Sequence, residues 1–272
     1  MVTARQLLDA GQLKAAIEAV TGEVRAAPGD ISKRVFLFEL LCFAGEWERA
    51  EKQLDVIGAQ DVKAEIGVKI YRDNIAAERQ RHQVFNHGAL PNFFVEPTAY
   101  VSWHLKAVSH IRAGEYTAAR EWLERAEEER PAFPGKFNGQ PFGDFRDADD
   151  LVAPILELIV QDRYLWLPFS QIKRLEIVRP AKLRDLIWAP VKIEAAESLG
   201  GFTGQAFIPA LYAGTSQHEN DQVRLGRMTD WRAYDGELAA SAGLRLFLVD
   251  GEDKTIFEAN TIEFGSSPAN QQ

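Results

Sequence analysis

Three short stretches of this chain repeat one pattern, in which a glycine is followed two residues later by a large apolar residue and five residues later by alanine. The stretches are GQLKAA from Gly11, GEWERA from Gly45 and GEYTAA from Gly114. The first two glycines lie 34 residues apart, and the third lies 69 residues further on, about twice that period. A period of 34 residues is typical of the tetratricopeptide repeat, a pair of antiparallel helices. The sequence therefore predicts at least two helical hairpins, with glycine in each tight turn and alanine where the helices approach closely.

Later positions of the three stretches agree with this interpretation. An aliphatic residue recurs nine residues after each glycine, as Val20, Leu54 and Leu123. Pro28 and Pro131 close the first and third copies, where proline ends the second helix. The middle copy has Val62 at that offset, which leaves open a simpler alternative, three unrelated amphipathic helices preceded by glycines.

Composition restricts the class of protein. With 272 residues, of which 46% are hydrophobic and 26% charged, the chain resembles an ordinary globular protein that has room for two domains or one large domain. The net charge is −9 and no basic face is evident, which argues against nucleic acid and membrane lipid as partners. No signal peptide or 18-residue apolar run occurs, and the single cysteine, Cys42, lies in an apolar run. We therefore expect a cytoplasmic protein with a buried thiol.

The first half of the chain has helical periodicity. Asp30 or Ser32 is expected to cap a helix that is apolar almost all round and therefore buried. A long helix is expected over residues 62–84, with Ile66, Ile70, Ile75 and Ala77 facing inward. A loop rich in aromatic residues follows from Phe85 to Pro97, and helices return over residues 98–113 and 116–129.

A cluster of four acidic residues opens a further helix that we expect over residues 149–161; they are Asp144, Asp147, Asp149 and Asp150. Closely spaced carboxylates attract hard cations. The spacing lacks the glycine and the distal glutamate of an EF-hand loop, whereas aspartate is a preferred helix cap and is favoured beside the positive end of the helix dipole. We therefore interpret the cluster as a cap and predict no metal site.

From Tyr164 onwards the hydrophobic period falls from about 3.6 to 2, which indicates strands. Strands are expected over residues 172–178, 191–195, 205–208, 244–249, 256–258 and 261–264, with a helical turn at 182–187. Short strands at regular spacing favour a small antiparallel sheet or barrel. The predicted fold class is thus α+β, and the change from helices to strands is expected between Asp150 and Leu167. The predicted parts are a tetratricopeptide-like helical domain (1–132), a linking segment with a helix (133–163), a β-rich domain (164–264) and a disordered tail (265–272).

The β-rich part contains candidate structural pairs. Trp166, Trp188 and Trp231 are large enough to dominate a small core. Arginines stand next to carboxylates with which they can pair internally, Arg184 beside Asp185 and both Arg224 and Arg227 near Asp230. We expect Arg227 and Trp231 to stabilise this domain. The alternative is a surface that recognises an acidic partner, because arginine and tryptophan are frequent at interaction hot spots.

No constellation of catalytic residues is evident. The five histidines, at 82, 87, 104, 110 and 218, stand at no metal-ligand spacing, and motifs for nucleotide binding and for serine or zinc hydrolases are missing. We therefore predict no cofactor and a non-enzymatic protein. An enzyme remains the alternative, with an active site between the two halves near residues 85–97 and the aspartate cluster. A buried cleft with converging Asp, His and Arg would favour the enzyme, and a shallow apolar groove between repeat helices would favour an adaptor.

Five motifs occur in a specific order in the second half: YLWLPF from Tyr164, LRDLIW from Leu183, IPALY from Ile208, RLGRMTDW from Arg224 and GLRLFL from Gly243. With GKFNGQPFGDFRDADD before them, the chain resembles the ImpE/TagJ family, accessory proteins of bacterial type VI secretion systems. The resemblance implies a cytoplasmic, auxiliary adaptor that in some systems contacts the small subunit of the contractile sheath and the neighbourhood of the ClpV-type disassembly ATPase.

The repeat alignment suggests where such a partner would bind. If Gly45 and Gly114 mark the turns of two helical hairpins, a helix ends just before each glycine. Residues three or four positions apart on each of these first helices lie on one side of the helix. This predicted stripe consists of Val35, Glu39, Phe43, Val101, His104, Val108 and Arg112. An apolar stripe with charged borders can receive a peptide or an amphipathic helix. The alternative is that the aromatic loop or the β-rich domain already covers it.

Overall fold

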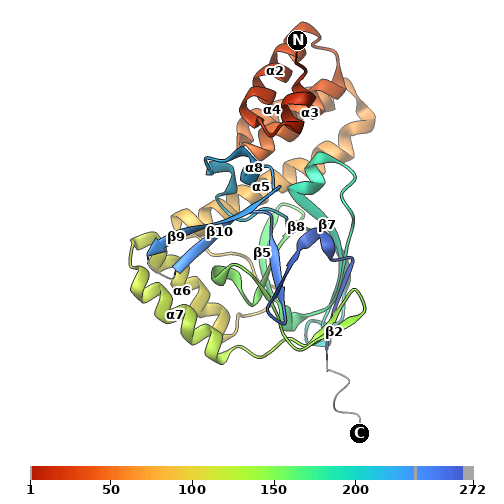
Figure 1. Ribbon diagram of the computed structural model, residues 1–272. Coiled ribbons are helices and arrows are strands. Elements are labelled where there is room, and N and C mark those ends of the chain that lie inside the picture. The colour runs from red at the N-terminus through yellow and green to blue at the C-terminus, as the bar shows by residue number, and fades with distance from the viewer. Residues whose placement is uncertain (1, 236–237, 266–272) are drawn as a thin grey trace.

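The structure, a computed structural model, describes residues 2–235 and 238–265. Figure 1 shows a helical layer at the N-terminal end and a β-rich body below it, joined by α5. The helices are α1 (Ala4–Asp9), α2 (Leu13–Ala26), α3 (Ile31–Phe43), α4 (Trp47–Gln60), α5 (Glu65–His87), α6 (Ala99–Ala113), α7 (Tyr116–Glu129) and the short α8 (Asp221–Arg224). The expected order of helices first and antiparallel strands second is confirmed.

The glycine pattern does mark helical hairpins. Gly11, Gly45 and Gly114 connect α1 to α2, α3 to α4 and α6 to α7, with φ angles of 74°, 69° and 76°. Residues with a Cβ atom are strained in this left-handed region of φ, which explains why glycine occupies all three turns. The alanine five residues after each glycine is fully buried, as is expected where two helices touch, and the aliphatic residue nine positions on is buried too.

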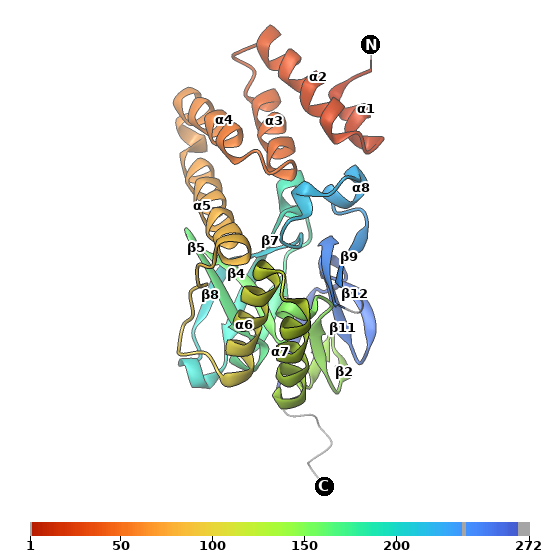
Figure 2. The same cartoon turned by 90° about the vertical axis from the view of Figure 1, so that its left-hand side faces the viewer.

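Helix α5 separates the third hairpin from the first two. Its 23 residues span about 35 Å at 1.5 Å per residue. Figure 2 shows α1 to α4 at its upper end and the α6–α7 hairpin against the β-rich body. The predicted inward orientation of the side chain is confirmed for Ile75 and Ala77, which are fully buried. It is wrong at Ile66 and Ile70, which are 77% and 38% exposed, because this stretch of α5 turns Val68, 6% exposed, toward the core.

The strands form a large sheet and two smaller ones. The eight-stranded sheet has the order β2-β1-β13-β6-β7-β8-β4-β5, a three-stranded sheet has β12-β11-β3, and β9 pairs with β10. All these strand pairs are antiparallel. The bounds are β1 (Gly135–Phe137), β2 (Gln140–Phe142), β3 (Phe145–Asp147), β4 (Ile155–Val160), β5 (Arg163–Pro168), β6 (Ile172–Ile177), β7 (Trp188–Ala195), β8 (Thr203–Pro209), β9 (Thr229–Asp235), β10 (Leu238–Gly243), β11 (Leu246–Val249), β12 (Glu252–Thr255) and β13 (Thr261–Phe264).

The strands begin earlier than the sequence predicted. The helix expected over residues 149–161 is wrong, because a short 3₁₀ turn, Asp150–Val152, is followed by strand β4. Pro154 ends the turn, and the run ILELIV after it is buried along nearly its whole length between α5 and the sheet core. Residues 135–147, expected as a link, form β1 to β3. The change from helices to strands thus falls between Glu129 and Gly135, before the expected window of Asp150 to Leu167.

Other expected elements have mixed outcomes. Strands β6, β7, β8, β11 and β13 and the helical turn Leu183–Leu186 lie where predicted, within a few residues. Residues 256–258, expected as a strand, form a 3₁₀ turn. Of the tail expected to be disordered, residues 266–272 lie outside the described residues.

The molecule has two large hydrophobic cores and a smaller one around Ala119 and Leu123 of α7. One runs without interruption from α1 to α6 into the β-rich half, where it includes Trp166 and Trp188. The other lies between the eight-stranded and three-stranded sheets, around Phe145, Phe169 and Phe247. The expectation for Trp231 is wrong, because β9 lies outside the main sheet and leaves this side chain 51% exposed. The helical and β-rich halves therefore share a core.

Candidate functional site

Aromatic and charged side chains join the two halves. Trp188 of β7 stacks on Tyr71 of α5, with ring centroids 6.1 Å apart, and its indole nitrogen donates to Glu78 at 3.1 Å. Arg184 donates to Glu39 of α3 at 3.0 Å and lies over the Tyr71 ring. The predicted pair of Arg184 with Asp185 is therefore wrong. Asp185 instead accepts two backbone N–H bonds at its own turn, from Ala181 and Lys182.

The segment 214–227 provides a second contact between the halves. Asp221 of α8 accepts from the backbone N–H of Leu13 at 2.8 Å and so caps α2 from another part of the chain. Arg227 donates to the carbonyls of Leu8 and Asp9 at 2.8 and 3.0 Å, at the end of α1. Both turn glycines of the first hairpins lie against this segment. A Cβ atom on Gly11 would lie 1.8 Å from the Gln222 amide nitrogen, and one on Gly45 would lie 2.6 Å from the Ser216 hydroxyl.

Two expected ion pairs, those of Arg224 and Arg227 with Asp230, are wrong. Arg224 pairs with Asp221 at 3.0 Å. Asp230 lies 3.3 Å from His218, so neither arginine pairs with it. Arg227 stabilises the contact between the halves rather than the β-rich half alone.

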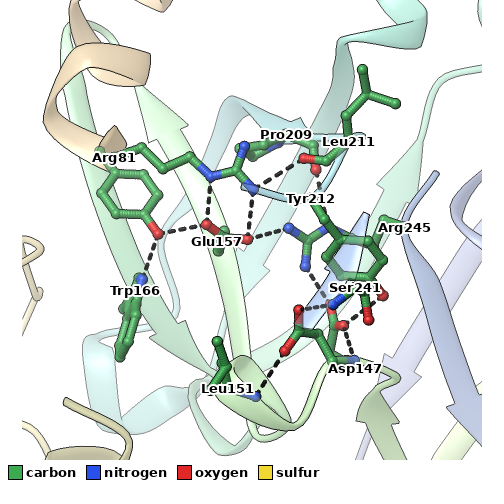
Figure 3. A network of polar contacts seen from close by, with 12 residues as sticks. Arg81, Asp147, Leu151, Glu157, Trp166, Pro209, Leu211, Tyr212, Ser241 and Arg245 are labelled. Atoms are coloured by element: carbon green, nitrogen blue, oxygen red, sulfur yellow. Dashed lines mark hydrogen bonds and ion pairs between the residues drawn. The ribbon is translucent and has the colours of Figure 1, made fainter. Parts of the chain in front are cut away.

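A buried polar network lies where α5 meets the sheet (Figure 3). Arg81 of α5 binds Glu157 of β4 through two hydrogen bonds of 2.7 and 3.0 Å. Arg245, with no exposed surface, contacts both Glu157 and Asp147 of β3. The Tyr164 hydroxyl donates to Glu157 at 2.5 Å, and that of Tyr212 donates to Asp147 at 2.8 Å. We call Arg81, Asp147, Glu157, Arg245 and the two tyrosines the buried network.

The charges in the buried network are paired, and this decides the state of Glu157. Burial alone would favour the neutral acid, but the Arg81 and Arg245 guanidiniums lower the pKa of Glu157 to about 2. Burial raises the pKa of Asp147, and Arg245 offsets part of that rise. Such pairs cost desolvation energy, and they fix geometry because every partner must be in place. The network therefore joins one helix and three strands in a fixed arrangement.

Asp149 lies next to the network but has no cationic partner among the described residues. Its two carboxylate oxygens accept from the backbone N–H groups of Leu151 and Ser241, at 2.9 and 3.0 Å. Burial, and then the charge of Asp147, raise the pKa of Asp149 to about 7. The predicted cap is confirmed for this residue, although the turn it caps is only three residues long.

A cavity of about 690 Å³ opens beside Asp149, and we call it the junction cavity. It lies between the ends of α5 and α6, the segment after β8 and the β9–β10 hairpin. Its walls include Phe85, Val108 and the half-exposed Trp231. His218, Arg232 and Asp149 all line it, which are the three residue types expected for the enzyme alternative, but Arg232 is exposed, so the cavity is open and not the buried cleft that this alternative expected.

The predicted stripe is largely covered by the chain itself. Glu39, Phe43, Val101, His104 and Val108 are between 0% and 7% exposed. Val35 is partly buried against the first core, and Arg112 alone is exposed, with its guanidinium donating to Ser109. His104 contacts the Leu151 carbonyl at 3.1 Å, and burial lowers its pKa to about 4, so it is neutral. The stripe's two parts lie in different hairpins on either side of α5.

A different apolar surface is open. Val62, Ile66 and Ile70 follow one another at intervals of four residues and are 81%, 77% and 38% exposed. Val62 and Ile66 line an open groove of about 710 Å³ between α4 and the start of α5, which we call the α4–α5 groove. Its charged border includes Asp55 and Arg72, which pair with each other at 2.5 Å.

No group of His, Cys, Asp or Glu in residues 2–235 and 238–265 has the arrangement of a metal site. Within the same residues, no helix has both the length and the apolar character needed to cross a membrane. Cys42 is buried and unpaired, and burial raises its pKa well above the usual value.

Comparison with known proteins identifies the family. Residues 139–263 match the model of the ImpE protein family. Over 266 residues the chain is 37% identical to a Pseudomonas aeruginosa protein named type VI secretion system accessory component TagJ, with 98% of this chain and 92% of that protein covered. The chain belongs to the ImpE/TagJ family. A crystal structure of a Vibrio parahaemolyticus protein is also similar, with a TM-score of 0.89, 26% identity and 98% of each chain covered.

The ImpE match includes most of the buried network. Asp147, Glu157 and Arg245 lie within it, as do Asp149 and Ser241 of the junction cavity, whereas Arg81 and the first two hairpins lie outside. Sequence reasoning did not select the network, although a signal existed. Glu157 and Arg245 are single charges of opposite sign within apolar runs, ILELIV and GLRLFLV. Such charges are buried only when paired, so the two runs indicate a contact.

Proposed function

We propose that this chain is a non-enzymatic, cytoplasmic accessory adaptor of a type VI secretion system, binding a helix or peptide of the small sheath subunit. The observation that carries the proposal is the similarity to the TagJ protein of Pseudomonas aeruginosa along 98% of this chain. Stacked helical hairpins with an apolar groove at their edge support a binding role.

We propose the α4–α5 groove as the surface for that segment, because the predicted stripe is covered. Val62 and Ile66 offer apolar contacts to one side of an amphipathic helix, and the charged border of Asp55, Lys69 and Arg72 can meet its polar edge. Binding at the stripe would require the β-rich half to separate from α3 and α6, with loss of the Arg184–Glu39 contact and the shared core.

The test is a double variant, Val62→Asp with Ile66→Asp, whose sites are exposed, so the fold should be retained by circular dichroism. We expect binding of the purified small sheath subunit, measured by calorimetry, to be lost. Leu90→Asp is the control, since this residue is also apolar and 73% exposed but lies outside the groove. Unchanged affinity of the folded double variant would exclude the groove.

The proposal includes a link to the ClpV-type ATPase. We expect the ATPase, the sheath subunit and this chain to elute together in size-exclusion chromatography. If only the sheath subunit co-elutes with this chain, the link to the ATPase is wrong and the sheath adaptor remains.

The enzyme alternative depends on the junction cavity. A covalent mechanism needs a nucleophile hydrogen-bonded to a base. Within residues 2–235 and 238–265, the Ser241 hydroxyl has no hydrogen-bond partner, and burial raises the pKa of Tyr212 well above its usual value. These features support binding in the cavity rather than catalysis.

A further inference from the structure

We propose that the junction cavity binds an organic cation, an ammonium or guanidinium group on an apolar stem, with Asp149 as its counter-ion and the Ser241 hydroxyl as hydrogen-bond acceptor. This inference is independent of the proposed adaptor function, because it concerns a different surface from the α4–α5 groove.

The charge of the cavity favours a cation. Four lining residues carry carboxylates, which are Asp149, Glu157, Glu219 and Asp230. The described lining residues include one guanidinium, that of Arg232, and one histidine, His218, which lies 3.3 Å from Asp230. Glu157 is already neutralised by Arg81 and Arg245. Asp149 is therefore the buried carboxylate for which a cation would supply the missing partner.

Ser241 gives an independent indication of a ligand. The residue is 3% exposed, lines the cavity, and its backbone N–H donates to Asp149. Within residues 2–235 and 238–265, no atom forms a hydrogen bond with its hydroxyl oxygen. Buried hydroxyls nearly always have a partner, so an unpaired hydroxyl on a residue in the wall of a cavity indicates a place for a ligand. Cations such as ammonium and guanidinium donate several hydrogen bonds, so one head group can reach both residues.

The walls suit an apolar stem. Phe85 and Val108 line one side of the cavity, from α5 and α6, and Trp231 lines the hairpin side. Trp231 is half exposed, so its ring can cover an aliphatic chain or lie over a cation. A volume of about 690 Å³ accommodates such a side chain or small molecule.

Protonation is coupled to this binding. Because the pKa of Asp149 is raised to about 7, a bound cation favours the charged form and releases a proton. The titratable and charged groups that face Asp149 are Asp147, Asp150, Tyr212 and Tyr234, and Arg232, His218, Glu157, Asp230 and Glu219 line the same cavity. We expect affinity to rise about tenfold between pH 6 and pH 8 as Asp149 ionises.

The experiment is calorimetric titration of the full chain with N-acetyl-arginine amide, N-acetyl-lysine amide, butylguanidine and butylamine. We expect saturable binding of at least one cation and none of N-acetyl-norleucine amide, the uncharged match of the lysine probe. Tighter binding of the capped amino acids would indicate a side chain of a peptide, and tighter binding of the simple cations would indicate a small molecule. Either outcome supports the proposal.

Three variants locate the cation. Asp149→Asn should weaken binding about a hundredfold, because a buried charge loses its partner. Asp150→Asn, on the same turn but 53% exposed and paired with Arg146, should not change it. Ser241→Ala should weaken binding about tenfold while leaving the free energy of unfolding unchanged, because the hydroxyl forms no hydrogen bond with the residues that the structure describes. This variant keeps the test valid if Asp149→Asn does not fold.

Several outcomes would overturn the proposal. These are no saturable binding of any of the four cations, equal binding of the norleucine probe, or undiminished binding by folded Asp149→Asn or Ser241→Ala.

Discussion

Glu157 and Asp149 lie at two ends of one buried polar region, and their carboxylates behave in opposite ways. Each side chain is almost completely covered. The pKa of Glu157 is lowered to about 2 and that of Asp149 is raised to about 7. The difference lies in their partners, since Glu157 is bound by Arg81 and Arg245, whereas the partners of the Asp149 carboxylate in the described part of the chain are backbone N–H groups. Burial makes the pKa of a carboxylate depend on its neighbours, and the two guanidiniums beside Glu157 lower its pKa, whereas backbone N–H groups do not offset the burial of Asp149.

Among the substitutions that test this comparison, we expect the removal of Arg245 to have the largest effect on stability. Arg245→Met removes the cationic partner of the buried Asp147 and one of the two partners of Glu157, which keeps Arg81, and we expect a loss of about 3 to 5 kcal/mol in the free energy of unfolding. Urea denaturation at pH 7 measures it. Arg174→Met is the matched control, because Arg174 also contacts two carboxylates but is 40% exposed. It should cost at most about 1 kcal/mol. Equal losses would contradict a special role of burial.

The pH dependence of the free energy of unfolding tests the other carboxylate of the comparison, Asp149. Asp149 has a folded pKa of about 7, above its value in the unfolded chain, so the folded state binds a proton more tightly. Its contribution is therefore favourable at low pH and is lost as the pH rises towards 7. Between pH 5 and pH 7, wild type should lose about 2 kcal/mol relative to Asp149→Asn. Asp150→Asn should follow the wild-type curve, and parallel curves for all three proteins would show that Asp149 does not titrate in this range.

A carboxylate at the contact between the halves should have an intermediate effect. Asp221 is partly exposed and caps α2 through the Leu13 N–H. Asp221→Ala should cost about 1 kcal/mol, the usual value of a helix cap. Asp253→Ala, at an exposed site on β12, serves as the control. Chemical denaturation that gives the same midpoint for wild type and Asp221→Ala would mean that the cap is not maintained in solution.

The smallest effect is expected at Trp231. Because the side chain is half exposed, Trp231→Ala should change stability by no more than about 0.5 kcal/mol. Trp166→Ala, fully buried against Phe85, should cost about 3 to 5 kcal/mol. Thermal unfolding followed by circular dichroism compares the two. A large loss at Trp231 would restore the interpretation of this residue as part of the core.

The helical hairpins could be predicted because they depend on local chemistry. A glycine that must adopt a positive φ and an alanine that must be small are visible in the sequence. The segment from Gly135 to Val160 could not be assigned in the same way. Its strands β1 to β3 have three residues each, too few to establish a period, and β4 is buried on both faces, so it lacks the alternation of a half-buried strand.

The candidate sites depend on contacts that sequence periodicity does not contain. The predicted stripe assumed that the first helices of two hairpins share a free face, but α5 separates the hairpins and the β-rich half covers both. Arg184 illustrates the limit. Its nearest carboxylate in sequence is Asp185, yet it binds Glu39, 145 positions away. Single charges within apolar runs were the more reliable indication, because a buried charge needs a partner wherever that partner lies.

The contact of the segment 214–227 with the first two hairpins has a consequence for synthesis. Arg227 binds Leu8 across 219 positions of the chain, and Asp221 binds Leu13 across 208. The hairpins can form early because their own contacts are local, but their glycine turns stay uncovered until the last quarter of the chain has left the ribosome. Such distant pairings are slow to form. We therefore expect docking of the two halves to be the rate-limiting event in folding, and a nascent chain halted before residue 214 to expose the turn surface to chaperones.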